Sequence, residues 1–245
     1  MGYAPPCRDL FLREISNLSN LLNRLLFDIK VILNVGVFPP KNLRVEFGPE
    51  NPFARGGYNP IRKSITLYGD DWCRKTLIHE LFHAISTFSR IPELRRIYDR
   101  ERAFVEGLTE FFTGYVLFTK YKDCYNEWIE GTYPVCTISY GGHVRLFGAV
   151  AQVLIPISDL AKIYVYNPSV DWFAEYRNFL NVHGLRDFLV QKPAGMRRES
   201  SCALFERMVG EAIRKKYGRG AINEFMDLLH EAPLSVVLDY SNMLK

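Results

Sequence analysis

Two histidines four positions apart, with a glutamate directly after the first, are the residues of this chain best suited to metal chemistry. They form the string His79-Glu80-Leu81-Phe82-His83, an H-E-x-x-H motif. On an α-helix with about 3.6 residues per turn, His79 and His83 lie one above the other, so both imidazoles can bind one metal ion. Glu80 lies about 100° around the helix and can reach a metal-bound water without being a ligand. The spacing predicts a catalytic metal site with Glu80 as the general base.

The alternative is that both histidines are ordinary helix-face residues that bond to neighbouring side chains. Apolar residues surround the pair, at Leu77, Ile78, Leu81, Phe82 and Ile85. They predict a buried helix, and buried imidazoles need partners because unsatisfied polar groups are costly away from water. A metal ion supplies such partners, so the sequence favours the metal site.

A glutamate in the next helical pattern is the candidate third ligand. Zinc bound by two histidines takes a third protein ligand and, in catalytic sites, keeps its fourth position for water. Glu106 can supply that ligand, and Gly107 beside it allows the two helices to approach closely. Glu110, one turn further on, can accept the outer N–H of a ligating histidine. A solvated acidic face is the alternative, which the aromatic residues of the same segment disfavour.

Hydrophobic periodicity predicts the helices that must hold these residues in place. Helical spacing is expected over residues 8–35, 92–120, 143–166, 171–182, 200–217 and 220–230. The motif helix is expected to begin at Asp70 or Asp71, whose side-chain oxygen can accept the N–H groups of the first turn. It is expected to run through Ser86 to about Ser89.

Two alternating runs, 43–47 and 61–68, predict the strands of a small antiparallel sheet. The stretch between them, 48–60, is rich in Pro, Gly and Asn and is expected to be a loop, and 121–142 an irregular crossing segment. The expected fold class is therefore α+β, with the sheet and the active-site helix in an N-terminal lobe and a mostly α-helical C-terminal lobe. The two lobes of this compact catalytic unit are expected to comprise residues 1–120 and 121–245.

Composition and charge narrow the classes of function. Of the 245 residues, 48% are hydrophobic and 24% charged, which is typical of a globular protein and not of a disordered chain. The formal net charge of +4, from 31 basic and 27 acidic residues, is too balanced for a dedicated nucleic-acid binder. Neither a leader pattern nor an apolar run long enough to span a bilayer is evident, so a cytoplasmic protein without membrane contact is expected.

The five cysteines contain no C-x-x-C pair, so neither a zinc finger nor a redox motif is present in the sequence. Their odd number leaves at least one thiol free. Cys124 and Cys136 can close a loop if the protein resides in an oxidising environment, but free thiols are expected.

The segments HELFH (79–83) and VEGLTEFFTGY (105–115) together resemble the gluzincin metallopeptidases, in which a glutamate ligand from a second helix follows H-E-x-x-H. The resemblance covers residues 43–155, and the small size is most similar to the compact members called minigluzincins. It implies one bound zinc ion as cofactor. By this resemblance the ligands are His79, His83 and Glu106, with Glu80 as general base and Glu110 supporting a ligand from behind.

Two further sites follow from the same resemblance. In the family, the strand before the zinc helix is the sheet edge that holds extended substrate. The corresponding residues are Ser64, Ile65, Thr66, Leu67 and Tyr68. Many members also supply a tyrosine or histidine that binds the developing oxyanion, and the segment with Tyr140 and His143 resembles that part of the family, with Tyr140 preferred. A structural tyrosine packed at a helix start is the alternative.

One departure from the family bears on the reaction. Aminopeptidase-type members carry a G-x-M-E-N stretch, whereas the nearest text here is Gly48-Pro49-Glu50-Asn51, which lacks the methionine and one position. An endopeptidase or oligopeptidase acting on a peptide or protein substrate is therefore the favoured function. A catalytically silent binding scaffold and a zinc hydrolase of a non-peptide bond are the alternatives.

Overall fold

The computed structural model describes residues 7–69, 73–86, 102–130, 141–153, 156–165, 210, 213–215 and 217–239. Within these ranges the strands are β1 (Arg44–Gly48), β2 (Gly56–Asn59) and β3 (Ser64–Tyr68). The first helices are α1 (Cys7–Glu14), the short 3₁₀ helix η1 (Ile15–Asn17), α2 (Leu18–Leu33) and α3 (Arg74–Ile85). The later helices are α6 (Arg102–Lys120), α7 (Lys122–Glu130), α8 (Gly141–Val153), α9 (Ile157–Val165), α13 (Arg219–His230) and α14 (Leu234–Val237).

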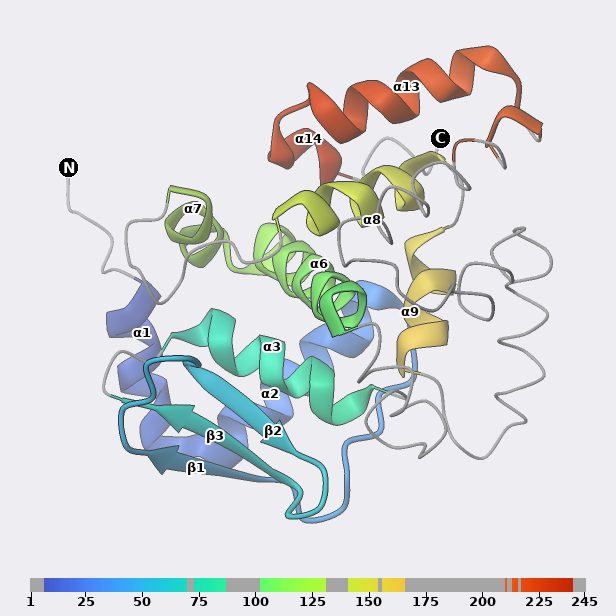
Figure 1. Ribbon diagram of the computed structural model, residues 1–245. Coiled ribbons are helices and arrows are strands. Elements are labelled where there is room, and N and C mark those ends of the chain that lie inside the picture. The colour runs from blue at the N-terminus through green and yellow to red at the C-terminus, as the bar shows by residue number, and fades with distance from the viewer. Residues whose placement is uncertain are drawn as a thin grey trace.

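β3 lies in the middle of the sheet, between β1 and β2 (Figure 1). β1 pairs with it in parallel, from Arg44 opposite Ser64 to Gly48 opposite Tyr68, whereas β2 pairs with it in the antiparallel sense. The predicted α+β class is confirmed, but the expectation of an entirely antiparallel sheet is wrong. The chain reverses direction twice between β1 and β3, once into β2 and once out of it, so β3 runs parallel to β1.

β2 is a strand within the stretch 48–60 that was expected to be a loop. Its residues, Gly56–Asn59, have low strand propensity apart from the tyrosine. They are extended because they pair with β3, beginning with Gly56 opposite Leu67. A cross-strand partner, and not the local sequence, therefore creates this strand.

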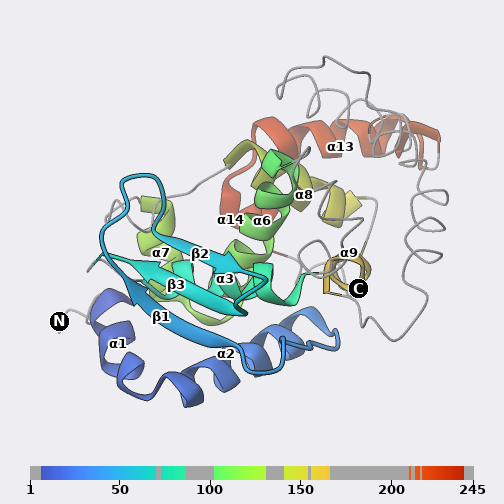
Figure 2. The ribbon, with the colours of Figure 1, turned by 60° about the horizontal axis from the view of Figure 1, so that its bottom comes forward.

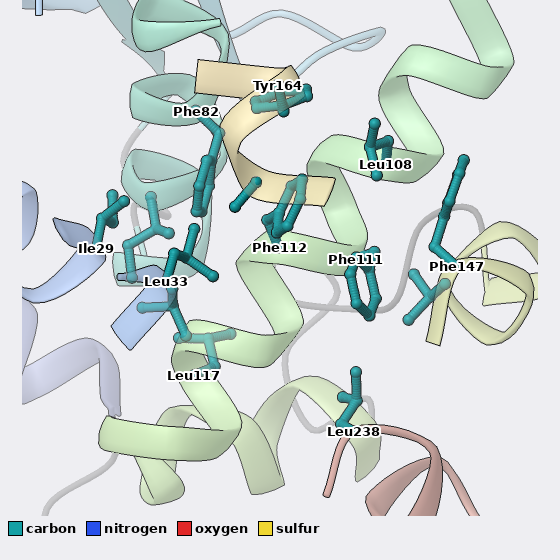
Figure 3. Packing of buried hydrophobic residues seen from close by; sticks show 14 of the residues in the cluster. Ile29, Leu33, Phe82, Leu108, Phe111, Phe112, Leu117, Phe147, Tyr164 and Leu238 are labelled. Carbon is teal, nitrogen blue, oxygen red and sulfur yellow. The ribbon is translucent and has the colours of Figure 1, made fainter. Parts of the chain in front are cut away.

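The first helical pattern, expected over 8–35, is divided into α1, η1 and α2. Asn17 caps α2 by accepting a hydrogen bond from the backbone N–H of Asn20. After Leu33 the helix is ended by Asn34, which has a left-handed backbone conformation that asparagine tolerates. The buried face of α2 has four-residue spacing, and each of its apolar members is at most 2% exposed: Leu21, Leu25, Ile29 and Leu33. Figure 3 shows the end of this face beside α3 and α6.

α3 carries the H-E-x-x-H motif and is enclosed along its length. Every residue of the helix is buried except His83, which is half-buried. β2 and β3 cover it on one side, and α1, α6 and α7 contact it as well. The motif is therefore held on a rigid element inside the protein, as the surrounding apolar residues predicted.

The ends of α3 differ from the expected ones. The helix begins after Cys73, whose extended backbone makes no side-chain capping bond, so neither Asp70 nor Asp71 is the N-cap. It ends at Ile85, before the expected Ser89, because the next residue is extended. Packing on several sides, rather than a capping side chain, holds this helix in place.

The elements follow one another in space from the sheet to the C-terminal helices (Figure 1). α3 contacts β2 and β3, α6 contacts α3, α8 contacts α6, and α13 and α14 contact α8. Figure 2 shows α1 and α2 on the side of the sheet where β1 lies. Aromatic rings join α3, α6 and α9 in the core, at Phe82, Phe111, Phe112 and Tyr164 (Figure 3). α6 thus lies between the motif helix and the C-terminal helices.

α7 corrects the expectation that 121–142 is irregular. The Gly and Pro residues that suggested irregular structure include a group in 131–140, which lies outside the described residues. Before them, Tyr125 and Trp128 bury one face of a regular helix against α6. Trp128 fits there because α6 has a glycine beneath it: a Cβ at Gly114 would lie 2.3 Å from the indole.

The remaining helical predictions are met in part. The pattern 143–166 forms α8 and α9, which are separate helices before and after Pro156, and the pattern 220–230 forms α13. The pattern 171–182 lies outside the described residues, as does most of 200–217. α6 ends at Lys120, and the division into two lobes at this point stays a prediction. Among the described helices, none has the length and apolar character needed to cross a membrane.

One cysteine differs from the expectation of free thiols. Cys124 of α7 is disulfide-bonded, whereas Cys73 is a buried thiol that forms no disulfide. Disulfide formation requires two sulfurs to meet in the folded chain, and spacing along the sequence does not give that proximity.

Candidate metal centre

Three side chains from two helices converge between α3 and α6. The Nε2 atoms of His79 and His83 lie 3.2 Å apart, and each lies 3.2 Å from Oε2 of Glu106. His79 and Glu106 are buried, at 9% and 8% exposure, and His83 is half-buried. The structure thus brings together the three predicted ligands, and this group can hold a metal ion.

The triangle of ligand atoms has the size that a tetrahedral metal ion requires. Bonds of about 2.0 Å in tetrahedral geometry separate the ligand atoms by about 3.3 Å. The observed separations are each 3.2 Å. Hydrogen bonds alone satisfy this group less well, because both Nε2 atoms point at the same carboxylate oxygen and lie 3.2 Å from each other, so that an N–H on each would bring two hydrogens into contact. Two imidazole nitrogens and one carboxylate oxygen are also ligand types that divalent transition metals accept.

Glu110, one helical turn after Glu106, contacts the other side of His79. It is fully buried, and its Oε2 lies 2.8 Å from Nδ1 of His79. Its second oxygen, Oε1, lies 2.9 Å from Nζ of Lys75 and 3.2 Å from Nε1 of Trp128. The expected contact between Glu110 and a histidine is therefore present, and two further residues join it.

Sequence reasoning did not single out Lys75 or Trp128. Lys75 stands one turn before His79 on a helix whose apolar pattern predicts burial. A lysine on such a helix needs a buried partner, so its position could have indicated an ion pair near the centre. Trp128 offers no comparable signal, because its partner Glu110 lies on another helix, 18 residues away in the chain.

Glu80 differs from the other carboxylates of the centre in its contacts with the described residues. Among the described residues it makes no ion pair and no side-chain hydrogen bond, although it is only 7% exposed. Glu106 and Glu110 each lie within hydrogen-bond distance of a histidine. A carboxylate without a fixed partner can accept and return a proton, which is what a general base does.

Gly56 of β2 lies directly against Glu80. A Cβ at this position would lie 2.7 Å from Cγ2 of Thr76 and 2.9 Å from Cγ of Glu80, so the close approach of β2 to α3 needs a glycine.

β2 also overturns one assignment, because it pairs with the side of β3 that was expected to be the edge. β3 is therefore not an edge strand, which corrects the assignment of its residues as the substrate-binding edge: Ser64, Ile65, Thr66, Leu67 and Tyr68. Within the described ranges, the sheet edge beside the centre is β2.

The two candidates for binding an oxyanion are not placed. Tyr140 lies outside the described residues. His143 belongs to the first turn of α8, but its side chain lies outside the described ones as well. Their roles therefore stay predictions.

When no metal is bound, contacts within the centre shift the pKa values of His79, Glu106 and Glu110. Burial by itself lowers the pKa of His79, but hydrogen bonds to Glu106 and Glu110 outweigh burial and raise that pKa to about 9. Burial raises the pKa of Glu106, yet the hydrogen bonds with His79 and His83 hold it far below its usual range. For Glu110, the charge of Lys75 and the contact with His79 likewise outweigh burial and lower the pKa to about 2.

These shifts predict how the stability of the chain, stripped of metal by a chelator, depends on pH. Because the pKa of His79 is raised, its contribution is complete below pH 6.5 and is lost as the pH rises through about 9. Because the pKa of Glu110 is lowered, its contribution is complete above pH 4.5 and is lost as the pH falls through about 2. Urea unfolding of the wild type and of His79→Gln across this range should give a difference in stability that shrinks above pH 6.5. A constant difference up to pH 10 would contradict the assignment.

Comparison with protein-family models, with curated proteins and with solved structures finds no match to this chain. The geometry of the centre is therefore the basis for assigning a function.

Proposed function

We propose that this chain is a zinc-dependent hydrolase of peptide bonds, in which His79, His83 and Glu106 bind one zinc ion and Glu80 is the general base. One observation carries the proposal. The carboxylate of Glu80 has no hydrogen-bond or ion-pair partner among the described residues, and Glu80 directly follows His79, one of three ligands whose atoms lie 3.2 Å apart. A purely structural zinc site has no need of such a carboxylate, because its ligands close the coordination sphere.

The ligand set, with Glu80 next to one of its histidines, supports the assignment of zinc. Two histidines and one glutamate are a ligand set of catalytic zinc sites, which leave the fourth position open. Zinc in such a site lowers the pKa of a coordinated water to about 7 and polarises a carbonyl oxygen. Glu110 supports this role from behind, because its contact with Nδ1 of His79 leaves Nε2 of that ring to face the metal.

The proton transfers belong to Glu80. Its carboxylate takes a proton from the attacking water and returns that proton to the leaving amine. The developing oxyanion needs a donor beside the metal, and Tyr140, with His143 as the alternative, is proposed for it.

The substrate backbone is proposed to pair with β2 and not with β3. The N–H of Tyr68 donates to the C=O of Arg55, which makes these two residues a hydrogen-bonded pair of the antiparallel ladder. Because such pairs alternate along the ladder, the N–H and C=O of Gly56 point away from β3. An extended peptide can therefore add to the sheet at Gly56, next to Glu80, through main-chain hydrogen bonds. Recognition of main chain suits internal peptide bonds, as expected of an endopeptidase or oligopeptidase.

The proposal is tested by incubating the zinc-loaded protein with a mixture of unstructured peptides and a panel of esters, and by locating the products with mass spectrometry. We expect cleavage at internal peptide bonds that a chelator stops and added zinc restores. Cleavage of esters alone would assign the centre to a non-peptide bond. Stoichiometric zinc without any turnover would favour a binding scaffold and would contradict the role of Glu80.

A further inference from the structure

The carboxylate of Glu110 is held at both oxygens by three side chains from two helices, α3 and α7. Oε2 lies 2.8 Å from Nδ1 of His79, and Oε1 lies 2.9 Å from Nζ of Lys75 and 3.2 Å from Nε1 of Trp128. A carboxylate can rotate about its last bond with little restriction. Two donors on one oxygen remove that freedom and leave the other oxygen facing His79.

Lys75 approaches Glu110 from the helix that carries the motif. It stands one turn before His79 on α3, and the residue is 8% exposed. A buried ion pair of this kind is weak evidence for stability, because removing two charges from water offsets their attraction. Its directional contact with Oε1 points instead to orientation of the carboxylate.

Trp128 approaches the same oxygen from α7, across a position where α6 has no side chain. Gly114 follows Glu110 by one helical turn, and a Cβ there would lie 2.3 Å from Cη2 and 2.7 Å from Cζ3 of the indole. The glycine therefore makes room for the indole to reach Glu110. Trp128 is fully buried, so its N–H has to find its partner within the protein.

We propose that Lys75 and Trp128 are positioning residues of the metal centre, which act through Glu110 to fix the orientation of His79. When a metal is bound, the carboxylate that they hold would accept the N–H of Nδ1 of His79, so that Nε2 keeps its lone pair for the metal. The inference rests on the metal site of the proposed function, but not on the reaction or the substrate.

The test measures zinc affinity by competition with a chromogenic chelator, using the metal alone and no substrate. Lys75→Met and Trp128→Phe remove one donor each, and Trp128→Phe keeps a ring over Gly114. We expect each to weaken zinc binding about tenfold, the low end of the effect of removing an outer-shell partner of a ligating histidine. Lys75→Arg keeps a charged donor and should restore part of the affinity. In Co²⁺-loaded protein, the two donor-removing variants should also change the visible absorption spectrum.

Matched controls separate orientation from general destabilisation. Lys120→Met removes a lysine that pairs with the buried Asp28 elsewhere in the protein. Tyr125→Phe alters a buried ring that contacts Trp128 on the same helix, at a centroid distance of 5.8 Å. Both controls should keep wild-type zinc affinity and the wild-type Co²⁺ spectrum. If Lys75→Met does not fold, Lys75→Arg and Trp128→Phe still carry the test.

Two results would overturn the inference. Folded Lys75→Met and Trp128→Phe proteins with wild-type zinc affinity and Co²⁺ spectrum would show that the two donors do not act on the metal. An equal loss of affinity in the controls would assign the effect to global stability. Failure to find a peptide substrate would leave the inference intact and count against the proposed function alone, whereas a wild-type chain that binds no zinc would overturn both.

Discussion

Glu80→Gln should lower kcat for peptide hydrolysis by roughly 10²–10⁴-fold, the usual contribution of a general base, and should leave the zinc content unchanged. Glutamine has nearly the same shape as glutamate but cannot accept the proton of the attacking water. Glu80 is not among the three residues whose atoms form the triangle at the centre, so the metal should bind as before. Steady-state kinetics on the best peptide substrate, with elemental analysis of the same samples, measure both quantities.

A distant variant and a neighbouring one sharpen this experiment. Glu224→Gln, on the exposed face of α13, is the matched control and should keep wild-type turnover. Gly56→Ala introduces a methyl group where a Cβ would lie 2.9 Å from Cγ of Glu80, so it should displace the base and lower kcat while zinc stays bound. A fully active Glu80→Gln enzyme would refute the assignment of Glu80 as the base.

His83→Ala should lose both the metal and the activity. The substitution removes one of three atoms that lie 3.2 Å from one another, and two remaining ligands do not hold zinc in a catalytic site. Elemental analysis of protein purified without added metal should find about one zinc per chain in the wild type and none in the variant. The fold should survive, because His83 is the half-buried residue of α3.

His230→Ala is the control for this substitution, since His230 ends α13 and is exposed. It should retain the full zinc content and activity. Zinc at wild-type stoichiometry in His83→Ala would place the metal elsewhere. A wild-type chain without zinc, even after reconstitution, would leave HELFH as a pair of packed helix residues and remove the basis of the hydrolase proposal.

Apart from Glu106, which was chosen as the third ligand that zinc requires, the parts of the centre that the sequence predicted are those fixed by helical geometry. Residues four apart on a helix share a face, so the spacing of His79 and His83 was sufficient to bring their rings together. The same rule placed Glu110 one turn after Glu106, and the structure has both carboxylates against His79. The apolar residues around the motif likewise predicted its burial correctly. These inferences need only the local chain and the periodicity of the helix.

The tertiary structure alone decided which strand is the edge and which side chains support the ligands. β2 exists because it pairs with β3, and its own sequence, led by Gly56 and Gly57, does not favour a strand. Trp128 of α7 reaches Glu110 because Gly114, on the same helix as Glu110, leaves space for the indole. The contact between Trp128 and Glu110 joins two helices, and the pairing of β2 with β3 joins two strands, so both depend on how separate elements pack. Local periodicity describes one element at a time, so it carries no information on such contacts.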